Sequence, residues 1–378
     1  MLFELSILLA LMFTYCTFIL MAVFGIYKLN KTKLKVSHSH YNYSFVSIIV
    51  SIKNESVNAK AFIHEIEKQT YSKEHFELII IDDFSNDNSF EIFKEILEES
   101  DINYKIFRKT SHFGKKRNVS EAINKAIGTI IITTDADVVY RDANWLTTIV
   151  NYFQKNNPSL LIMPIDYILD SGILSNFQMT ENLALTGITA GFCGIHKPFL
   201  CNGSNLAFTK SAFNSVGGYS NHIDVSSGED VFLLEDLKRI DIKAIHYSWQ
   251  QELIVKTKTV NFIFDLLNQR IRWAKKFKQN PNVLNFVFGF ILICASLIYV
   301  FLPIAILNQS LITPYLLIFC CSKLILDFLL LFLTSKFFGK TKHLLYLFPF
   351  EFLYWLYAIL VGFGALFIKP TWKGVKVK

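Results

Sequence analysis

The sequence contains little glycine and proline, and its cysteines follow no pattern. Among 378 residues there are 16 Gly and 8 Pro, which excludes a collagen-like chain and a low-complexity disordered one. The six cysteines are spread along the chain and form no C-x-x-C pair. A disulfide-stapled secreted module is therefore excluded, and reduced thiols in a core or facing lipid explain these cysteines better than a zinc site.

Charged residues are also scarce, at 18% of the chain, whereas 52% of the residues are hydrophobic and the mean hydropathy is +0.34. This composition is too apolar for an ordinary soluble domain, yet it has too many Lys, Asp and Glu for a pure membrane bundle. We therefore expect a composite chain. The net charge of +7 is concentrated beside the apolar segments, so binding to nucleic acid is not supported.

The first apolar segment predicts a transmembrane helix at residues 1–28. No charged residue occurs from Leu5 to Tyr27, and a helix of this length can cross a hydrocarbon core of roughly 30 Å. A cleaved signal peptide fits less well, because no basic region precedes the run and no clear cleavage site follows it. Four lysines between residues 28 and 35 then favour a cytosolic position for the next region.

A second apolar block, at residues 281–370, predicts two or three further spans, and a basic tail follows at residues 371–378. The hydrophobic stretches are approximately Leu284–Leu307, Leu311–Leu333 and Leu344–Ile368. Three crossings would place the basic tail outside, although cationic segments prefer the cytosol. Pro349 and Glu351 could mark a re-entrant segment or a hairpin that returns the tail inside, and we prefer this arrangement.

One ion pair is predicted within this apolar block. Lys323 and Asp327 are four residues apart, so on a helix they share a face and can neutralise each other inside the bilayer. A structural pair is a better interpretation of these two residues than a role in transport.

Residues 43–280 predict a single α/β domain in which strand and helix patterns alternate. Alternation of this kind implies a mostly parallel sheet with helices on both faces. Ligands of such sheets bind beyond the carboxyl ends of the strands. The predicted strands are Phe45–Ile52, Phe76–Ile81 and Thr129–Thr134, and the predicted helices are Val57–Gln69, Phe90–Glu98 and Ser120–Ile127.

The residues that follow these strands are polar and mostly acidic. Glu55 follows the first strand, Asp82 and Asp83 follow the second, and Asp135 and Asp137 follow the third. Carboxylates gathered at one edge would repel one another unless a cation or a donor-rich ligand lies among them. Asp135 and Asp137 should be the last extended residues of their strand, with side chains on the same face. Their hard oxygens suit Mg²⁺ or Mn²⁺ beside a nucleotide diphosphate.

These segments resemble the family 2 glycosyltransferases with the GT-A fold, particularly the membrane-embedded bacterial members related to cellulose and hyaluronan synthases. The resemblance covers roughly residues 45–276, with its motifs in the expected order. V-S-I-I-V-S-I-K-N-E at residues 46–55 is similar to a strand that usually ends in P-A-R-N-E. I-D-D-F-S-N-D at residues 81–87 has Phe84 where Gly is usual, and T-D-A-D at residues 134–137 resembles the family's metal motif.

The resemblance implies roles for these acidic residues and for one lysine. Glu55 and Asp83 would contact the nucleobase and ribose of a sugar nucleotide. Asp137 would be the direct metal ligand, and Asp135 would be shared between metal and nucleotide. Lys115, in the segment Gly114–Asn118, could reach a phosphate, although a solvated run of charge is an equal interpretation.

Two further segments resemble the parts of the family that handle the acceptor. Cys201–Phe208, which includes Gly203, is similar to the segment that lines the sugar and acceptor site, although Asn-Gly is also a plain turn signal. Glu229 and Asp230 resemble the E-D motif, in which Asp230 would deprotonate the acceptor hydroxyl and the displacement would invert the anomeric carbon. With Ser227 as the cap, the same residues also read as a capping box, and both interpretations can hold.

The last motif resembles Q-R-x-R-W of the synthase-like members, and it comprises Gln269, Arg270, Arg272 and Trp273. Guanidinium groups suit diphosphate oxygens, and an indole offers a stacking face to a sugar ring or acceptor. Cationic residues before a span also fix topology. Gln and Trp add nothing to a topology signal, so a role in the site is favoured.

These expectations define an inverting glycosyltransferase that depends on Mg²⁺ or Mn²⁺. Its donor would be a nucleotide-sugar, UDP- or GDP-linked, and its acceptor a lipid-linked or membrane-proximal glycan. The resemblance implies a protein of the bacterial inner (plasma) membrane with a cytosolic catalytic domain. A membrane-anchored nucleotidyltransferase and a catalytically inactive scaffold stay open as alternatives, although Asp135, Asp137 and Asp230 are all present.

Overall fold

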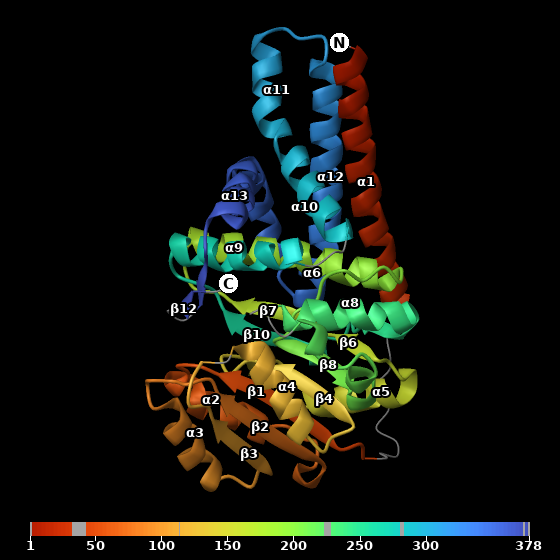
Figure 1. Cartoon of the computed structure of the whole chain (residues 1–378). Coiled ribbons are helices and arrows are strands. Elements are labelled where there is room, and N and C mark those ends of the chain that lie inside the picture. The colour runs from red at the N-terminus through yellow and green to blue at the C-terminus, as the bar shows by residue number, and fades with distance from the viewer. Residues whose placement is uncertain are drawn as a thin grey trace. The chain divides into compact units, whose positions relative to one another are not determined.

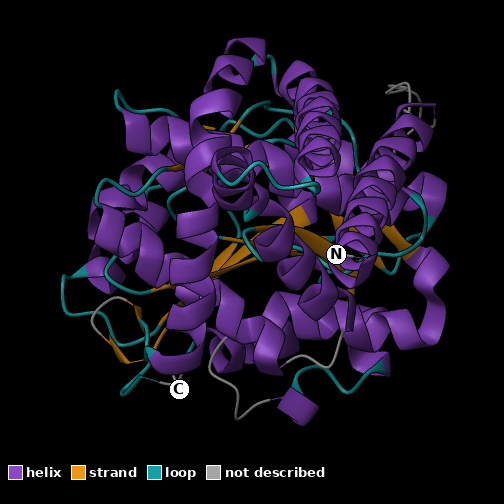
Figure 2. Ribbon diagram, turned by 90° about the horizontal axis from the view of Figure 1, so that it is seen from above, coloured by secondary structure: helices purple, strands orange, loops and turns teal. Residues whose placement is uncertain are grey.

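The computed structural model describes residues 2–31, 43–112, 114–222, 228–279, 283–372 and 375–376. It divides into two compact units, each assembled from separate stretches of the chain. The helical unit contains residues 1–28, 169–195 and 259–370, and the α/β unit contains residues 29–168, 196–258 and 371–378. Every strand that the structure describes belongs to the α/β unit (Figure 1, Figure 2).

The α/β unit is built on a seven-stranded sheet in the order β3-β2-β1-β4-β8-β6-β9. Strands β3, β2, β1 and β4 run parallel, whereas β8 is antiparallel to both β4 and β6. The predicted mostly parallel α/β sheet is therefore confirmed. The strands are β1 (Val46–Ile52), β2 (Phe76–Asp82), β3 (Tyr104–Arg108), β4 (Ile130–Thr134), β6 (Leu160–Ile162), β8 (Asn205–Thr209) and β9 (Ile245–Tyr247).

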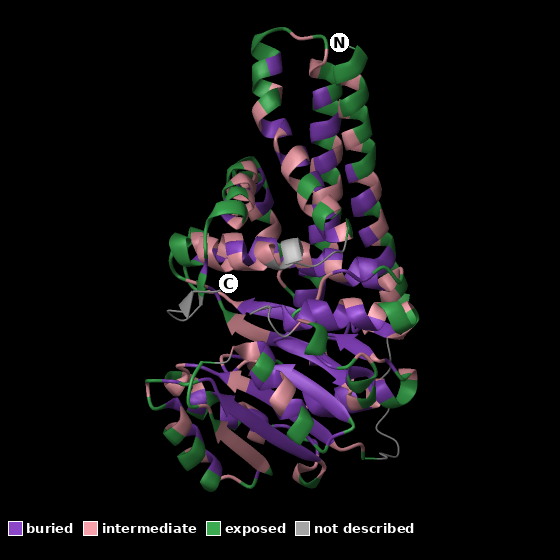
Figure 3. Ribbon diagram, in the orientation of Figure 1, coloured by how far each residue is buried: buried purple, intermediate pink, exposed green. Residues whose placement is uncertain are grey.

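Helices cover both faces of this sheet. Alternate residues of β1, β2 and β4 face a core shared with α2 (Ala59–Glu67), α3 (Ser89–Glu98) and α5 (Trp145–Asn156). On the other face, Asn118 of α4 (Lys115–Lys125) approaches Ser51 of β1. The central strands, which are rich in Val and Ile, are buried (Figure 3). Burying each Val or Ile side chain fully stabilises the folded state by about 1.5–3 kcal/mol relative to leaving it exposed. Burial on both faces explains why these strands read as continuous apolar runs.

Smaller elements complete the α/β unit. A second sheet has the order β5-β10-β7, and α7 and α8 follow β8 along the chain. A two-stranded hairpin lies near the end of the chain. The elements are β5 (Val139–Tyr140), β7 (Ile165–Ile168), β10 (Val255–Lys258), α7 (Lys210–Ser215), α8 (Glu229–Asp241), β11 (Thr371–Trp372) and β12 (Val375–Lys376).

Among the residues that the structure describes, the helical unit contains four segments that are long and apolar enough to cross a membrane, at Leu2–Lys31, Val283–Leu307, Thr313–Phe338 and Thr341–Phe367. Apolar side chains of these segments, such as Phe13 and Phe301, are exposed, as contact with lipid requires. Figure 3 shows exposed residues along α1 and α11. Its helices are α1 (Leu2–Lys31), α6 (Ile173–Gly194), α9 (Ile263–Gln279), α10 (Val283–Ser296), α11 (Ile298–Leu307), α12 (Thr313–Phe338) and α13 (Leu347–Phe367).

Two features of the helical unit differ from the expectations. The hairpin at Pro349 and Glu351 does not form, because α13 is one continuous helix with Pro349 in its first turn, where proline is tolerated. Helices α6 and α9 fall within the predicted domain of residues 43–280, yet they cluster with the membrane segments. Their apolar side chains find partners there: Phe177 of α6 packs edge-on against Phe350.

Small residues allow α1 and α6 to pack with their backbones in contact. A Cβ atom on Gly191 would overlap the backbone of Ala22, and one on Gly25 would overlap the backbone of Gly191. A Cβ on Gly194 would in turn overlap the backbone of Gly25. Helices in membranes pack closely at such positions, because only small residues let their backbones approach.

We predict that Gly191→Ala lowers the stability of the purified protein by about 1–3 kcal/mol, because the new methyl group has no space. The matched control is Gly289→Ala in α10, where a Cβ meets nothing within 4 Å. That change should leave the thermal midpoint unchanged or raise it, since Ala favours helix over Gly. Equal midpoints for the two variants in detergent would contradict the packing.

Candidate active site

The acidic residues expected beyond the strands lie at one edge of the main sheet. Because β1 pairs in parallel with β2 and β4, Ile52 lies beside Asp82, and Val50 lies beside Thr134. The antiparallel β8 begins at the same edge, where its Asn205 pairs with Thr134. The carboxyl ends of three strands and the loop before β8 therefore meet in one region, as the parallel topology predicts.

Asp135 and Asp137 lie in a turn, not on the strand. Strand β4 ends at Thr134, so the expectation that both aspartates are extended residues of one strand face is wrong. The turn still brings their charges together: burial, then the carboxylates of Asp135 and Glu55, raise the pKa of Asp137 to about 6. Thr257 of β10 donates a hydrogen bond of 3.2 Å to Asp137 Oδ2.

Lys115 joins this turn to the start of helix α8. Its Nζ atom lies 2.6 Å from Asp135 Oδ1 and 3.6 Å from Glu229 Oε1. Burial alone would lower the pKa of Lys115, but the carboxylates of Asp135, Glu229 and Asp230 together raise it. The side chain of Lys115 is therefore held among carboxylates, which does not fit a solvated run of charge.

Glu229 and Asp230 form the first turn of α8, and both are buried. The amide of Gly203 donates to Asp230 Oδ2 at 3.1 Å, so the loop before β8 touches the acidic start of the helix. The N-cap is Gly228, with a φ of 89° that favours glycine. Ser227, proposed above as the cap, lies outside the described residues.

Asp83 and Glu55 have defined partners. Asp83 is fully buried, accepts a hydrogen bond of 3.3 Å from the Gly114 amide and pairs with His112. Glu55 accepts a hydrogen bond of 2.6 Å from the Asn58 amide group. No motif in the sequence pointed to His112 or to Thr257. Each is distant in sequence from the aspartate that it contacts, and the two meet only in the folded domain.

The neighbours of Asp83 have structural roles. Asp82 accepts from the Ser85 amide and hydroxyl, and burial raises its pKa. Phe84 adopts a φ of 60° with half its surface exposed, a left-handed conformation that suits glycine better. This accounts for the glycine that is usual at this position in the sequences that the motif resembles.

The two lysines at the start of α4 have different partners. Lys116 is 2% exposed, donates to the carbonyl of His222 at 2.8 Å and lies 4.3 Å from the ring centre of Phe232. Contacts of this kind hold a loop and a helix in place. Lys116 is therefore structural, whereas Lys115 faces the acidic cluster.

The Q-R-x-R-W residues belong to the helical unit, on α9. The Arg270 guanidinium group is buried, with Nη2 2.6 Å and Nε 2.8 Å from Glu181 Oε2. It also stacks over Trp273 at 4.2 Å and hydrogen-bonds to Gln269. A diphosphate role for Gln269, Arg270, Arg272 and Trp273 stays a prediction, and within this unit Arg270 has a carboxylate partner.

The residues present can accommodate a divalent cation of the kind expected. Within the described residues there is no group of three or more His, Cys, Asp or Glu that could hold a metal by itself. Mg²⁺, however, is usually bound by one or two carboxylates together with substrate phosphates and water. Asp135 and Asp137 supply two carboxylates, and the pKa of Asp137 is raised by burial first and then by the neighbouring charges of Asp135 and Glu55.

In mostly parallel α/β sheets, nucleotide ligands commonly bind beyond the carboxyl ends of the strands, where the acidic residues of this chain lie. The model of glycosyl transferase family 2 matches residues 47–217, which include every strand of the main sheet except β1's first residue and β9. Residues 47–217 thus match a family 2 glycosyltransferase domain.

Relatives with curated names come from archaea and bacteria. Glycosyltransferase AglE of Haloferax volcanii is 23% identical over 49% of this chain, and poly-beta-1,6-N-acetyl-D-glucosamine synthase of Staphylococcus epidermidis is 25% identical over 64%. The chain spans 59% and 57% of the lengths of these two relatives. The mannosyltransferase PcManGT of Pyrobaculum calidifontis, solved with GDP-Man and Mn²⁺, has a TM-score of 0.59 and 15% identity, and the alignment covers 97% of this chain and 99% of that one. This likeness confirms the GT-A fold.

We predict that Lys116→Met lowers the free energy of unfolding by about 1–3 kcal/mol, because the His222 carbonyl loses its buried donor. The control is Lys60→Met on α2, where the lysine is exposed and its removal should change stability little. Thermal unfolding of the purified variants measures the difference. If Lys116→Met unfolds at the same temperature as Lys60→Met, the structural role of Lys116 is wrong.

Proposed function

We propose that the protein is an inverting, divalent-metal-dependent glycosyltransferase that moves a sugar from a nucleotide-sugar to a lipid-linked or membrane-proximal acceptor. The observation that carries the proposal is the position of Lys115, between Asp135 of one acidic motif and Glu229 of the other. Lys115 thus links the carboxylates proposed to hold the metal ion with those proposed to bind and deprotonate the acceptor.

The donor would bind at the edge formed by β1, β2 and β4. Glu55 and Asp83 would contact the nucleoside, and the rigid support of Asp83 by Gly114 and His112 would fix its orientation. Lys115 would exchange its contact with Asp135 for a phosphate oxygen when the diphosphate arrives. A lysine ammonium group makes strong, charge-assisted bonds to phosphate, which supports this exchange.

Asp135 and Asp137 would hold Mg²⁺ or Mn²⁺ together with the diphosphate. The cation would neutralise the charge that develops on the leaving diphosphate. The hydrogen bond from Thr257 to Asp137 would hold the carboxylate in position. The Mn²⁺ in the PcManGT structure supports a divalent ion in a protein of this fold.

Asp230 would act as the general base. The Gly203 amide and the helix α8 start hold its carboxylate in place, and Asp230 would take the proton from the acceptor hydroxyl as that oxygen attacks the anomeric carbon. The attack comes from the side opposite the diphosphate, so the anomeric configuration would invert. Glu229, beside Lys115, would assist in binding the acceptor.

The membrane segments support an acceptor at or near the membrane. The described part of the chain has four segments long and apolar enough to cross a bilayer, and Lys28 and Lys31 lie at the end of the first of them. Basic flanks stay in the cytosol, so we place the transferase domain there, at the bacterial inner (plasma) membrane. Undecaprenyl-phosphate 4-deoxy-4-formamido-L-arabinose transferase of Shewanella sediminis, 30% identical over 98 residues, supports an acceptor linked to a lipid.

We predict that Asp137→Ala reduces sugar transfer about a hundredfold or more, because the charge of the leaving diphosphate loses its cation. The assay follows release of free nucleoside diphosphate from a panel of UDP- and GDP-sugars with Mg²⁺ or Mn²⁺. The control is Asp101→Ala, whose side chain is 91% exposed. Full activity of Asp137→Ala, with the fold confirmed by circular dichroism, would overturn the metal assignment.

We predict that Asp230→Asn lowers kcat about 10²- to 10⁴-fold, because an amide cannot accept the acceptor's proton. Binding of the nucleotide donor, measured by calorimetry, should remain, since Asp230 is given no contact with it. If turnover persists while binding is unchanged, the base is another residue, and Glu229→Gln is the next variant to test.

A further inference from the structure

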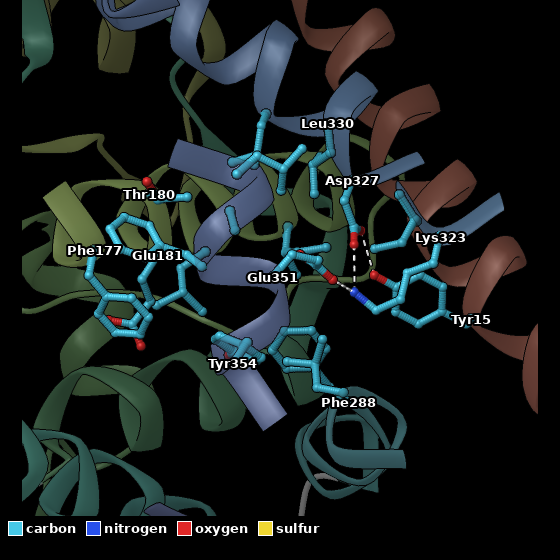
Figure 4. A pocket seen from close by; sticks show the side chains of 18 residues that line it. Tyr15, Phe177, Thr180, Glu181, Phe288, Lys323, Asp327, Leu330, Glu351 and Tyr354 are labelled. Carbon is cyan, nitrogen blue, oxygen red and sulfur yellow. Dashed lines mark hydrogen bonds and ion pairs between the residues drawn. The ribbon is translucent and has the colours of Figure 1, made fainter. Parts of the chain in front are cut away.

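A cavity of about 100 Å³ lies within the helical unit. Helices α1, α6, α10, α12 and α13 line it, so all four apolar segments that could cross a membrane contribute to its walls. Most of the lining side chains are Leu, Ile and Phe (Figure 4). A space of this size, between helices of this kind, suits the small headgroup of a lipid whose acyl chains lie among the apolar helices.

The cavity also contains a buried charged cluster, which we define as Lys323, Asp327, Glu351 and Tyr15. Lys323 Nζ lies 2.8 Å from Asp327 Oδ2 and pairs with Glu351, and the Tyr15 hydroxyl donates to Asp327. These side chains come from α1, α12 and α13, and Figure 4 shows that they converge. The predicted pair of Lys323 and Asp327 is therefore confirmed. Glu351 adds a second carboxylate to the same lysine.

A second polar group lies on α6. Glu181 lines the cavity, and it accepts hydrogen bonds from Arg270 and, at 2.6 Å, from the Tyr357 hydroxyl. With Arg270 included, the cavity and its adjoining partners hold three carboxylates and two cationic side chains. The two groups of charge therefore leave an excess of one carboxylate in an apolar space.

We infer that this cavity binds a lipid whose headgroup is uncharged and carries hydroxyl groups. A carboxylate offers about four lone-pair sites, so Asp327 and Glu351 can accept hydroxyl donors in addition to Lys323. A lipid phosphate would instead meet an excess of carboxylates where the dielectric constant is low, and their repulsion would be strong. The charge balance therefore favours a phosphate-free headgroup.

Two lipids that differ only in the phosphate test this inference. Dioleoylglycerol and dioleoyl phosphatidate have the same acyl chains, and their affinities for the full-length protein can be compared by native mass spectrometry from detergent. We predict that dioleoylglycerol binds about tenfold more tightly or better, a difference of about 1.4 kcal/mol. Tighter or equal binding of the phosphatidate, or no binding of either lipid, would overturn the inference.

Two variants separate the cavity from other lipid contacts. Ala184→Phe places a ring in the cavity, because Ala184 is one of its lining residues, and it should weaken dioleoylglycerol binding about tenfold. Ile325→Phe is the matched control, since Ile325 lies on α12 and is 65% exposed. If the control and Ala184→Phe bind equally, the lipid lies elsewhere.

Glu351→Gln tests the role of charge and leaves the Lys323–Asp327 pair intact. Removal of the excess carboxylate should narrow the preference for dioleoylglycerol over the phosphatidate about tenfold. A purely structural role of Glu351 would lower the thermal midpoint and leave that preference unchanged. The measurement uses no nucleotide-sugar, so its outcome is independent of the proposed transfer reaction.

Discussion

The arrangement of the candidate active site depends on one partly buried amino group, that of Lys115. Without it, Asp135, Glu229 and Asp230 would bring three negative charges together at the edge of the sheet, in a region where water screens them poorly. The lysine offsets this repulsion and connects the turn after β4 to the start of α8. Its place on the first turn of α4 follows from Gly114, whose φ of 86° lets the chain enter the helix directly.

A site with a resident lysine is prepared for an anionic ligand. The diphosphate of a donor and a divalent cation together would replace the ion pairs that Lys115 makes in their absence. The protein therefore does not have to create charge compensation at the moment of binding. Preorganised charges of this kind require little rearrangement during the reaction, and such electrostatic terms are usually large contributors to catalysis.

Much of this site could be predicted from the sequence, because β1, β2 and β4 are apolar runs and the acids follow directly. Local patterns could not identify contacts made through the fold: His112 beside Asp83, and Thr257 beside Asp137. The turn at Asp135 was also missed, since strand ends cannot be located to one residue from propensity. Glu351 was interpreted as a possible helix break, because a single charge in an apolar run has no visible partner in the sequence. Its partner, Lys323, lies 28 residues earlier and is found only in the folded structure.

In both units, carboxylates lie close together and their repulsion must be offset, but the groups that offset it differ. Each holds one lysine between two carboxylates: Lys115 in the α/β unit, and Lys323 in the helical unit. In the α/β unit, the proposed metal ion and diphosphate would enter from water and balance the remaining charge. Among apolar helices an ion is costly to bring in. Hydroxyl donors such as Tyr15, which hydrogen-bonds to Asp327, stabilise the remaining carboxylate charge instead. By the same reasoning, we expect a neutral hydroxyl-bearing headgroup in the helical cavity and a phosphate at the sheet edge.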